Sequence, residues 1–146
     1  MSRVAGLYDQ DFYAWAMKNA ELIRQGCWAD IDQEHMAEEM ESMGRSEWYE
    51  LVDRLAVLLA HLLKWRYQPE RRGNSWRLTI KEQRRRVQLR LKKSPSLQYE
   101  IGETLFEAYE SAVLQAAKEM KVAESLFPPT CPFTLEQVLD SDFWPD

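Results

Sequence analysis

Glycine, proline and cysteine are all scarce in this chain. Its 146 residues include five Gly, six Pro and two Cys, and long stretches contain neither Gly nor Pro. Because Gly and Pro mark most turns, their scarcity favours helices over a β architecture with many turns. Cys27 and Cys131 lie far apart and in no metal-ligand spacing. We therefore expect free thiols in a reducing cytosol, with a single disulfide as the alternative.

Long hydrophobic runs are also lacking. The longest apolar run, residues 55–63, has nine residues and includes His61. That is about half of the ~20 residues that a membrane-spanning helix needs. Residues 1–6 do not show the basic-then-apolar pattern of a signal peptide. The sequence therefore predicts a cytoplasmic protein that does not bind membranes.

The signatures of nucleophilic catalysis are missing as well. The sequence has no G-x-S-x-G segment and no Gly-rich phosphate loop. Cys27, beside Trp28, fits a small apolar filler better than a reactive thiol. From this we predict no catalytic residue, no metal ligand and no cofactor, and an enzyme is the less expected outcome.

What the chain does contain is enough apolar material for one folded domain. Hydrophobic residues make up 45% of the sequence and aromatic residues 12%, with six Trp. A chain of this length buries roughly two-thirds of its unfolded surface. Residues 1–146 are therefore predicted to form a single helical domain.

Apolar side chains recur at helical spacing along the whole chain. The expected fold class is all-α, a compact bundle of five main helices plus a short C-terminal helix. The five are expected at about 9–25, from 30 or 32 to 44, 46–67, 76–93 and 94–121, and the short one ends near 140. The third has a wide apolar face, which predicts a central, heavily buried helix.

Particular residues predict where these helices begin and end. Gly26 and Gly44 are expected C-terminal terminators, and Ser46 an N-cap. Ser94 followed by Pro95 is a strong start signal. The fourth helix carries apolar residues on nearly opposite faces, which predicts contacts on both sides. Asn74 or Ser75 is expected to be the N-cap of the fourth helix. Thr134 and Gln137 are expected to form a capping box at the start of the last helix. The tail residues Phe143, Trp144 and Pro145 are expected to pack back on the domain as an apolar clasp.

Charge is distributed very unevenly. Residues 64–93 hold twelve of the nineteen Lys and Arg against two acids, a net charge of +10. The segments before and after carry −7 and −8, so the chain as a whole is only −5. This basic segment either meets an anionic partner or neutralises the acidic parts of its own chain, above all the acidic helix that begins near residue 30.

Two interpretations of the basic segment remain open. Arg pairs readily with carboxylates, and a pI near 5.2 is low for a dedicated nucleic-acid binder, so contact with an acidic surface, either of its own chain or of a protein partner, including self-association, is favoured. The alternative is binding of nucleic acid, with phosphates neutralised by the basic residues and bases stacked on Trp65, Tyr67 and Trp76. The predicted surface for an anionic partner consists of Arg71, Arg72, Arg77, Lys81, Arg84 and Arg85.

A second alternative is an unrecognised enzyme or metal protein around the two histidines. His35 faces Glu38 and Glu39 one turn on, a spacing that can ligate a metal. A solvated acidic face with His35 as a local hydrogen bonder is the simpler interpretation. His61 lies in an apolar run and is expected to be a core histidine, bonded to a backbone carbonyl or to a carboxylate, rather than a general base.

Several motifs together resemble a bacterial family. They are Tyr8-Asp9-Gln10-Asp11-Phe12-Tyr13-Ala14-Trp15, Glu38-Glu39-Met40-Glu41-Ser42-Met43-Gly44-Arg45-Ser46-Glu47, His61-Leu62-Leu63-Lys64-Trp65, Tyr67-Gln68-Pro69-Glu70-Arg71-Arg72, Ser75-Trp76, Ser94-Pro95-Ser96-Leu97 and Cys131-Pro132-Phe133-Thr134-Leu135-Glu136-Gln137. Over roughly residues 7–143 the chain resembles the family called domain of unknown function 29. The resemblance implies an all-helical bacterial protein, and it implies no activity and no site residues.

Overall fold

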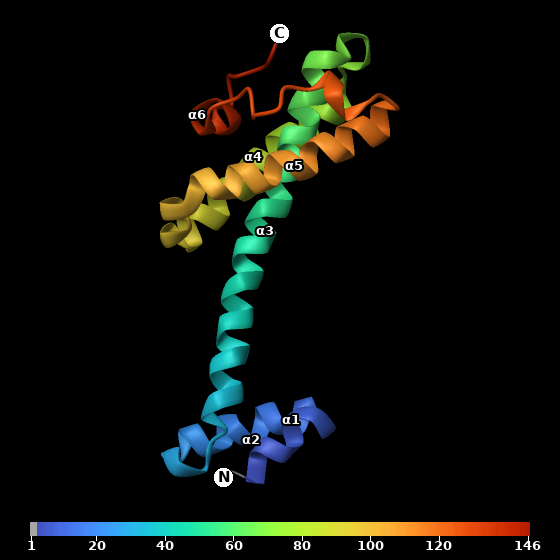
Figure 1. The fold of residues 1–146 in the computed structure, drawn as a ribbon. Coiled ribbons are helices and arrows are strands. Elements are labelled where there is room, and N and C mark those ends of the chain that lie inside the picture. Colours follow the sequence, from blue (N-terminus) through green and yellow to red (C-terminus); the bar gives the residue numbers. More distant parts are fainter. Residues whose placement is uncertain (1–2) are drawn as a thin grey trace. The chain divides into compact units, whose positions relative to one another are not determined.

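The predicted all-α class is confirmed by a computed structural model that describes residues 3–146 (Figure 1). Within that range the chain forms six α-helices and no strand. The helices are α1 Leu7–Gln10, α2 Phe12–Arg24, α3 Gln33–Tyr67, α4 Asn74–Lys93, α5 Ile101–Met120 and the short α6 Leu135–Leu139. Five 3-10 turns accompany them: η1 Arg3–Gly6, η2 Trp28–Asp30, η3 Pro69–Arg71, η4 Pro95–Glu100 and η5 Glu124–Leu126.

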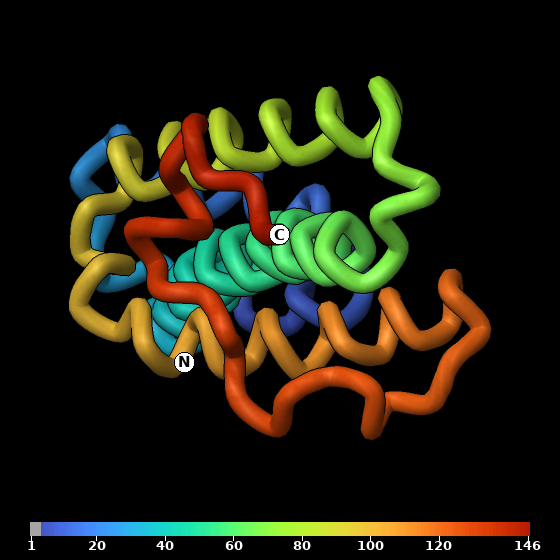
Figure 2. The backbone as a smooth tube through the Cα atoms, turned by 90° about the horizontal axis from the view of Figure 1, so that it is seen from above, coloured from blue at the N-terminus to red at the C-terminus, as the bar shows by residue number. Residues whose placement is uncertain are grey.

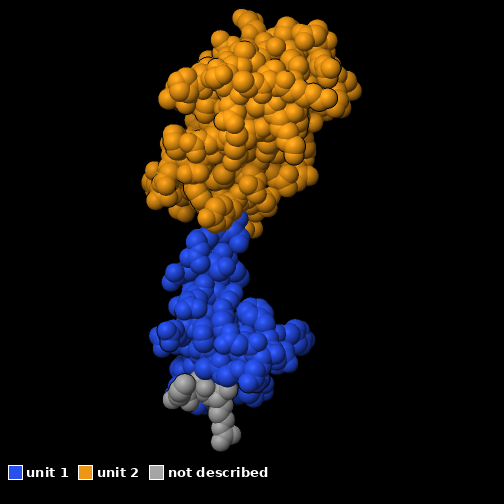
Figure 3. Space-filling model, turned by 45° about the vertical axis from the view of Figure 1, so that its right-hand side comes forward, with its two compact units in different colours: residues 1–46 blue, residues 47–146 orange. Residues whose placement is uncertain are grey.

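The chain divides into two compact units (Figure 3). Unit 1 ends at Ser46 and unit 2 comprises Glu47–Asp146, so the boundary falls inside α3. Each unit buries its own hydrophobic cluster. The single domain over residues 1–146 stays a prediction. A single domain requires that the two clusters unfold together, and the structure does not test this.

Unit 1 is built on α2 and the start of α3. Its buried apolar residues are Val4, Trp15 and Leu22, and the last two lie two turns apart on the predicted stripe of α2. Asp11 caps α2 by accepting a hydrogen bond from the Ala14 amide at 3.0 Å. Gly26 follows the helix with φ of +74°, which confirms the predicted terminator, since this left-handed conformation favours glycine.

Helix α3 corrects the predicted break at residue 44. One continuous helix runs through Gly44 and Ser46 instead of two helices separated there. Ser46 is not a cap, since its hydroxyl donates to the Ser42 carbonyl one turn earlier at 3.1 Å. A glycine inside a helix costs only about 1 kcal/mol, which the hydrogen bonds and packing of the other turns offset. Around Gly44, residues 40–46 are all exposed.

In unit 2 the second half of α3 is the central element, as predicted. Ten of its residues are buried, among them Leu55, Leu59 and Leu62, each with no exposed surface. Helices α4 and α5 lie on opposite sides of this part of α3 and run antiparallel to each other (Figures 1 and 2). The Trp48 indole N–H donates to the Thr104 hydroxyl at 2.9 Å and links α3 to α5.

The C-terminal segment closes unit 2 over the end of α3 (Figure 2). Trp144 packs on Trp65 with ring centroids 4.6 Å apart, and Phe143 packs edge-on against Phe133. These contacts confirm the predicted clasp. The predicted capping box is also present, since Thr134 and Gln137 each bond the other's backbone amide at the start of α6.

Two other helix starts differ from the prediction. Gly73 is the N-cap of α4, and the Asn74 side chain accepts a hydrogen bond from Arg77 instead of capping the helix. Pro95 opens the 3-10 turn η4, so α5 begins only at Ile101, and Ser94 makes no capping hydrogen bond. The Ser-Pro signal therefore marks a helical turn, although one of the tighter 3-10 type.

Candidate binding surface

Helix α4 has one buried side and one open side. Ile80, Val87 and Leu91 pack into the core of unit 2, with 0%, 0% and 7% of their surface exposed. Leu78 and Leu89 are each 50% exposed. The prediction that both apolar stripes of this helix contact neighbours was therefore wrong. The physical reason is that α4 lies at the edge of unit 2 and has α3 on one side only.

Arg84 corrects the predicted surface, because it is buried with 3% of its area exposed. Its Nε donates to the Val138 carbonyl at 2.8 Å and its Nη2 to the Phe143 carbonyl at 2.7 Å. The guanidinium also lies over the Trp144 ring, 5.3 Å from the centroid. Burial lowers the pKa of this guanidinium, and Asp140 opposes the effect. Arg84 therefore holds the C-terminal segment in place instead of facing a partner.

Arg72 has a similar internal role. Its Nε donates to the Trp65 carbonyl at 2.6 Å, and its Nη2 reaches the Pro145 carbonyl at 3.4 Å. The guanidinium lies 5.4 Å from the Trp65 ring centroid. Two of the six predicted surface residues are thus tied to main-chain carbonyls of their own chain. The structure brings these two together with Trp65, Trp144 and the tail, whereas the other four are exposed.

Arg85 and Arg86 share one carboxylate on their own helix. Arg85 bonds Glu82 through Nε and Nη2 at 3.1 and 2.8 Å, and Arg86 reaches the same carboxylate at 2.8 Å. These hydrogen bonds lower the pKa of Glu82 to about 2. One acid facing two guanidinium groups leaves net positive charge at this point of the surface.

Ion pairs between helices also use part of the basic segment. Arg90 lies 3.0 Å from Glu47 and 3.6 Å from Glu50 on α3, and Lys93 lies 3.7 Å from Glu47. The sequence had indicated the acidic helix that begins near residue 30 as the partner, whereas these two acids come from the start of the predicted third helix. Ion pairs at a partly exposed surface fix helix order more than they add stability.

Lys64 is buried beside Glu119, whereas four other cations of the segment stay open to solvent. Arg71, Lys81 and Lys92 are exposed and make no ion pair with any residue from 3 to 146, and Arg77 bonds only the neutral Asn74 side chain at 2.6 Å. On α4 these positions flank the half-exposed Leu78 and Leu89 at helical spacing. We call this surface the α4 face; it consists of Arg77, Leu78, Lys81, Arg85, Leu89 and Lys92, with Arg71 in the turn before it.

His35 makes the local hydrogen bond that the simpler interpretation predicted, but the polar cluster of unit 1 around it was not foreseen. The buried Asp32 carboxylate accepts hydrogen bonds from the Trp15 indole at 2.9 Å and from His35 Nδ1 at 2.7 Å. The His35 ring stacks on Tyr8, with centroids 3.9 Å apart. The Asn19 side chain accepts from the Asp32 amide at 2.8 Å. The one sequence signal was Asn19, a polar residue inside the apolar stripe of α2.

The charges of this cluster are coupled. The hydrogen bond that His35 donates to Asp32 raises the pKa of His35 above its ordinary value, although partial burial opposes it. Burial alone would raise the pKa of Asp32, but the hydrogen bonds from Trp15 and His35 hold it below its ordinary value. Tyr8 donates to Glu39, and this raises the pKa of Tyr8 to about 12. The cluster ties α1, α2 and the start of α3 together by satisfied polar groups.

His61 bonds a backbone carbonyl, as predicted for a core histidine. Its Nδ1 lies 2.8 Å from the Val57 carbonyl one turn earlier, and burial lowers its pKa. The two cysteines are free thiols, as expected. Within residues 3–146, no group of three or more His, Cys, Asp and Glu side chains lies in an arrangement that could hold a metal ion.

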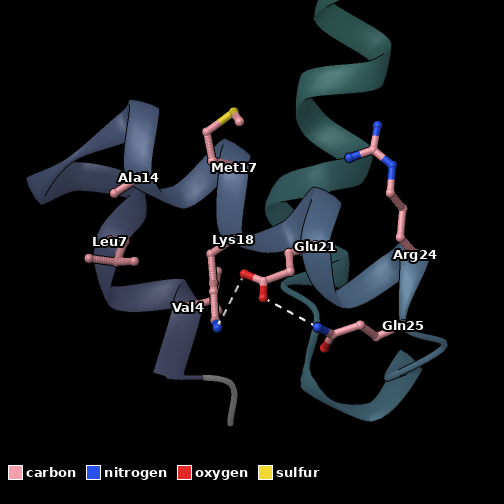
Figure 4. A pocket seen from close by; sticks show the side chains of 8 residues that line it. All are labelled: Val4, Leu7, Ala14, Met17, Lys18, Glu21, Arg24 and Gln25. Atoms are coloured by element: carbon pink, nitrogen blue, oxygen red, sulfur yellow. Dashed lines mark hydrogen bonds and ion pairs between the residues drawn. The ribbon is translucent and has the colours of Figure 1, made fainter.

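A hollow in unit 1 lies against α2 (Figure 4). It has a volume of about 720 Å³ and apolar walls that include Leu7 and Met17. Two of its polar side chains contact the Glu21 carboxylate: Lys18 lies 3.6 Å from it, and Gln25 donates to it at 3.2 Å. Among the described helices, none is long and apolar enough to cross a membrane.

Comparison with known proteins supplies a family and no activity. No curated protein and no solved structure matches this sequence. The family model described as "Domain of unknown function DUF29" matches residues 7–144, nearly the whole chain. That range includes both α3 and α4, and with them the buried Arg84 and the α4 face. The chain therefore belongs to the family of domain of unknown function DUF29.

Proposed function

We propose that this protein is a non-enzymatic, cytoplasmic binding protein whose α4 face holds an acidic, helical surface of a protein partner. The observation that carries the proposal is the pair Leu78 and Leu89, each 50% exposed. They lie among cations of which four, Arg71, Arg77, Lys81 and Lys92, contact no carboxylate within residues 3–146. The two leucines are eleven residues apart, about three helical turns. An apolar pair inside a charged frame suits a protein surface, because apolar contact supplies affinity and charge supplies orientation.

The aromatic side chains near the basic segment favour a protein over a nucleic acid. Trp65 packs between Trp144 and the Arg72 guanidinium, and Tyr67 packs on Phe127. Binding of single strands depends on open aromatic faces for base stacking. The three aromatics that suggested stacking from the sequence are all partly buried. A nucleic acid would thus contact the cations of the α4 face, and the two leucines would contribute little to its binding.

The test uses two probes on the full chain. The first is a fluorescein-labelled, Glu-rich helical peptide with two leucines on one face, and the second is a random DNA duplex together with a single strand. Binding is measured by anisotropy at about 50 and about 200 mM salt. We expect the peptide to bind more tightly than either DNA, and both to weaken with salt. Binding of DNA alone would replace this proposal by the nucleic-acid alternative.

Two variants separate the contributions of charge and apolar contact. Lys81→Glu with Lys92→Glu is expected to weaken peptide binding at least about tenfold, or about 1.4 kcal/mol. Leu78→Ser with Leu89→Ser is expected to weaken it by a similar factor, since the two leucines would form the desolvated centre. Lys118→Glu, an exposed cation on α5, is the matched control. Peptide binding that is indifferent to both double variants would contradict the proposal.

A further inference from the structure

Helix α5 has an open face of opposite charge. Phe106 and Leu114 are each 56% exposed. Glu103, Glu107 and Glu110 are exposed beside them at spacings of four and three residues, so they line the same face of the helix. None of these three acids makes an ion pair with any residue in the described part of the chain. We call this surface, Glu103, Phe106, Glu107, Glu110 and Leu114, the α5 face.

A groove borders the α5 face. It has a volume of about 650 Å³ and runs between α5 and the segment after it. Its walls include Val113, Leu114 and Phe127, and its edge carries Glu110 and Glu124. An apolar groove with carboxylates at its edge matches a helix that presents leucines between lysines and arginines. The α4 face has that composition.

The two faces cannot meet within one molecule. Helices α4 and α5 lie on opposite sides of α3, and each packs its apolar stripe toward it (Figure 2). The α4 face and the α5 face therefore look away from each other. Each remains an unpartnered surface of one charge around two half-exposed apolar side chains.

We propose that a second copy of this chain covers the α4 face with its α5 face. This inference rests on the proposed function and names its partner. The charges are complementary along the contact: Lys81, Lys92 and Arg77 on one helix meet Glu103, Glu107 and Glu110 on the other. The apolar pairs, Leu78 with Leu89 and Phe106 with Leu114, span about 16 and about 12 Å along their helices, so they fit a common contact.

The geometry also sets the kind of assembly. The contact joins two different patches that lie on opposite sides of unit 2, so each added copy leaves one α4 face and one α5 face open. Heterologous contacts of this kind give open chains unless the rotation closes a ring. We therefore expect a series of oligomers that grows with protein concentration, not a single closed dimer.

Sedimentation velocity on the full chain tests this inference over a concentration series. The wild type is expected to show rising mean mass, and association is expected to weaken at least about threefold from about 0.05 to about 0.3 M salt as charges are screened. Glu107→Lys with Glu110→Lys is expected to lower the association constant at least tenfold. Circular dichroism checks that the variant keeps its helices.

A competing acidic surface serves as the control. Residues 37–46 of α3 also combine acids with exposed methionines, Met40 and Met43 at 64% and 58%. Met40→Ser with Met43→Ser is expected to leave association unchanged. Loss of association in this variant and not in the α5 variant would overturn the inference in favour of α3.

The two proposals can fail separately. The α5 variant keeps its α4 face and is expected to bind the acidic peptide as the wild type does. A wild type that is monomeric at every concentration but binds this peptide through Lys81 and Lys92 overturns the self-association and leaves the proposed function standing. A wild type that does neither overturns both.

Discussion

Replacing Arg84 with alanine should strongly destabilise unit 2. The guanidinium is buried, and it donates to the Val138 and Phe143 carbonyls at 2.8 and 2.7 Å. A hydrogen bond from a charged group contributes about 1.5–3 kcal/mol, and each carbonyl left unbonded in the interior adds a desolvation cost. The variant also loses the contact with Trp144 and leaves a cavity. We expect Arg84→Ala to lower the free energy of unfolding by about 3–5 kcal/mol.

The neighbouring arginine provides a matched control. Arg85 is exposed and bonds only Glu82 on its own helix. Exposed pairs within one helix contribute about 0.3–0.5 kcal/mol, so Arg85→Ala is expected to change stability by no more than about 0.5 kcal/mol. Arg84→Lys keeps the charge but not the planar fork that reaches both carbonyls, so it should recover only part of the loss.

Two measurements check this prediction. Urea unfolding followed by circular dichroism gives the free energies, and amide hydrogen exchange reports local opening of residues 138–145. In Arg84→Ala the exchange in that segment should rise before global unfolding. A variant that is within about 0.5 kcal/mol of the wild type, with unchanged exchange, would refute the role given to Arg84.

The remaining predictions concern α3 and the polar cluster of unit 1. Gly44→Ala should stabilise the helix by about 0.5–1 kcal/mol in thermal or urea unfolding, because Gly44 is helical and an added Cβ meets no atom within 4 Å; a destabilised variant would show that residues 40–46 are not held as a helix. The His35 pKa is raised in the folded state, so its contribution to stability is fully present below about pH 6.5 and is lost as pH rises through the folded pKa. Asp32 acts in the opposite sense, since its lowered pKa gives stability that is lost as pH falls through that pKa. Unfolding of unit 1 followed at several pH values should therefore show a decline in stability as pH rises above about 6.5 that is absent in His35→Gln. Equal pH profiles would contradict the His35–Asp32 pair.

The sequence was sufficient to predict the fold class because local signals agree with the packing. The wide apolar face of residues 46–67 predicted the buried helix at the centre of unit 2. Thr134 and Gln137 predicted the capping box, and Gly26 the end of α2. These features depend on neighbours in sequence, so periodicity and capping chemistry are enough to locate them.

The helix break predicted at Gly44 and Ser46 was wrong because the preference of these residues for helix ends is weak. Glycine is a frequent helix terminator, but it ends a helix only where the backbone turns left-handed, as it does at Gly26 and not at Gly44. Ser46 caps a helix only if the chain before it is not helical. Neither condition is visible in composition alone.

The binding surface could be predicted only in part. Arg71, Arg77, Lys81 and Arg85 are exposed, whereas Arg84 and Arg72 bond carbonyls of a tail that is 54 to 73 residues away in sequence. Only the fold brings that tail to α4. The α5 face could not be predicted for a related reason. Its acids form a surface complementary to the α4 face only because the fold places α4 and α5 on opposite sides of α3.

The most direct test of the account mixes two full-length variants that should each be unable to associate. One carries Lys81→Glu and Lys92→Glu on the α4 face, and the other Glu107→Lys and Glu110→Lys on the α5 face. Sedimentation velocity should find each variant monomeric at concentrations where the wild type associates, and an equal mixture should regain association. The first variant keeps the acidic α5 face that the second variant's α4 face binds. A mixture that stays monomeric while the wild type associates would contradict the pairing of these two faces.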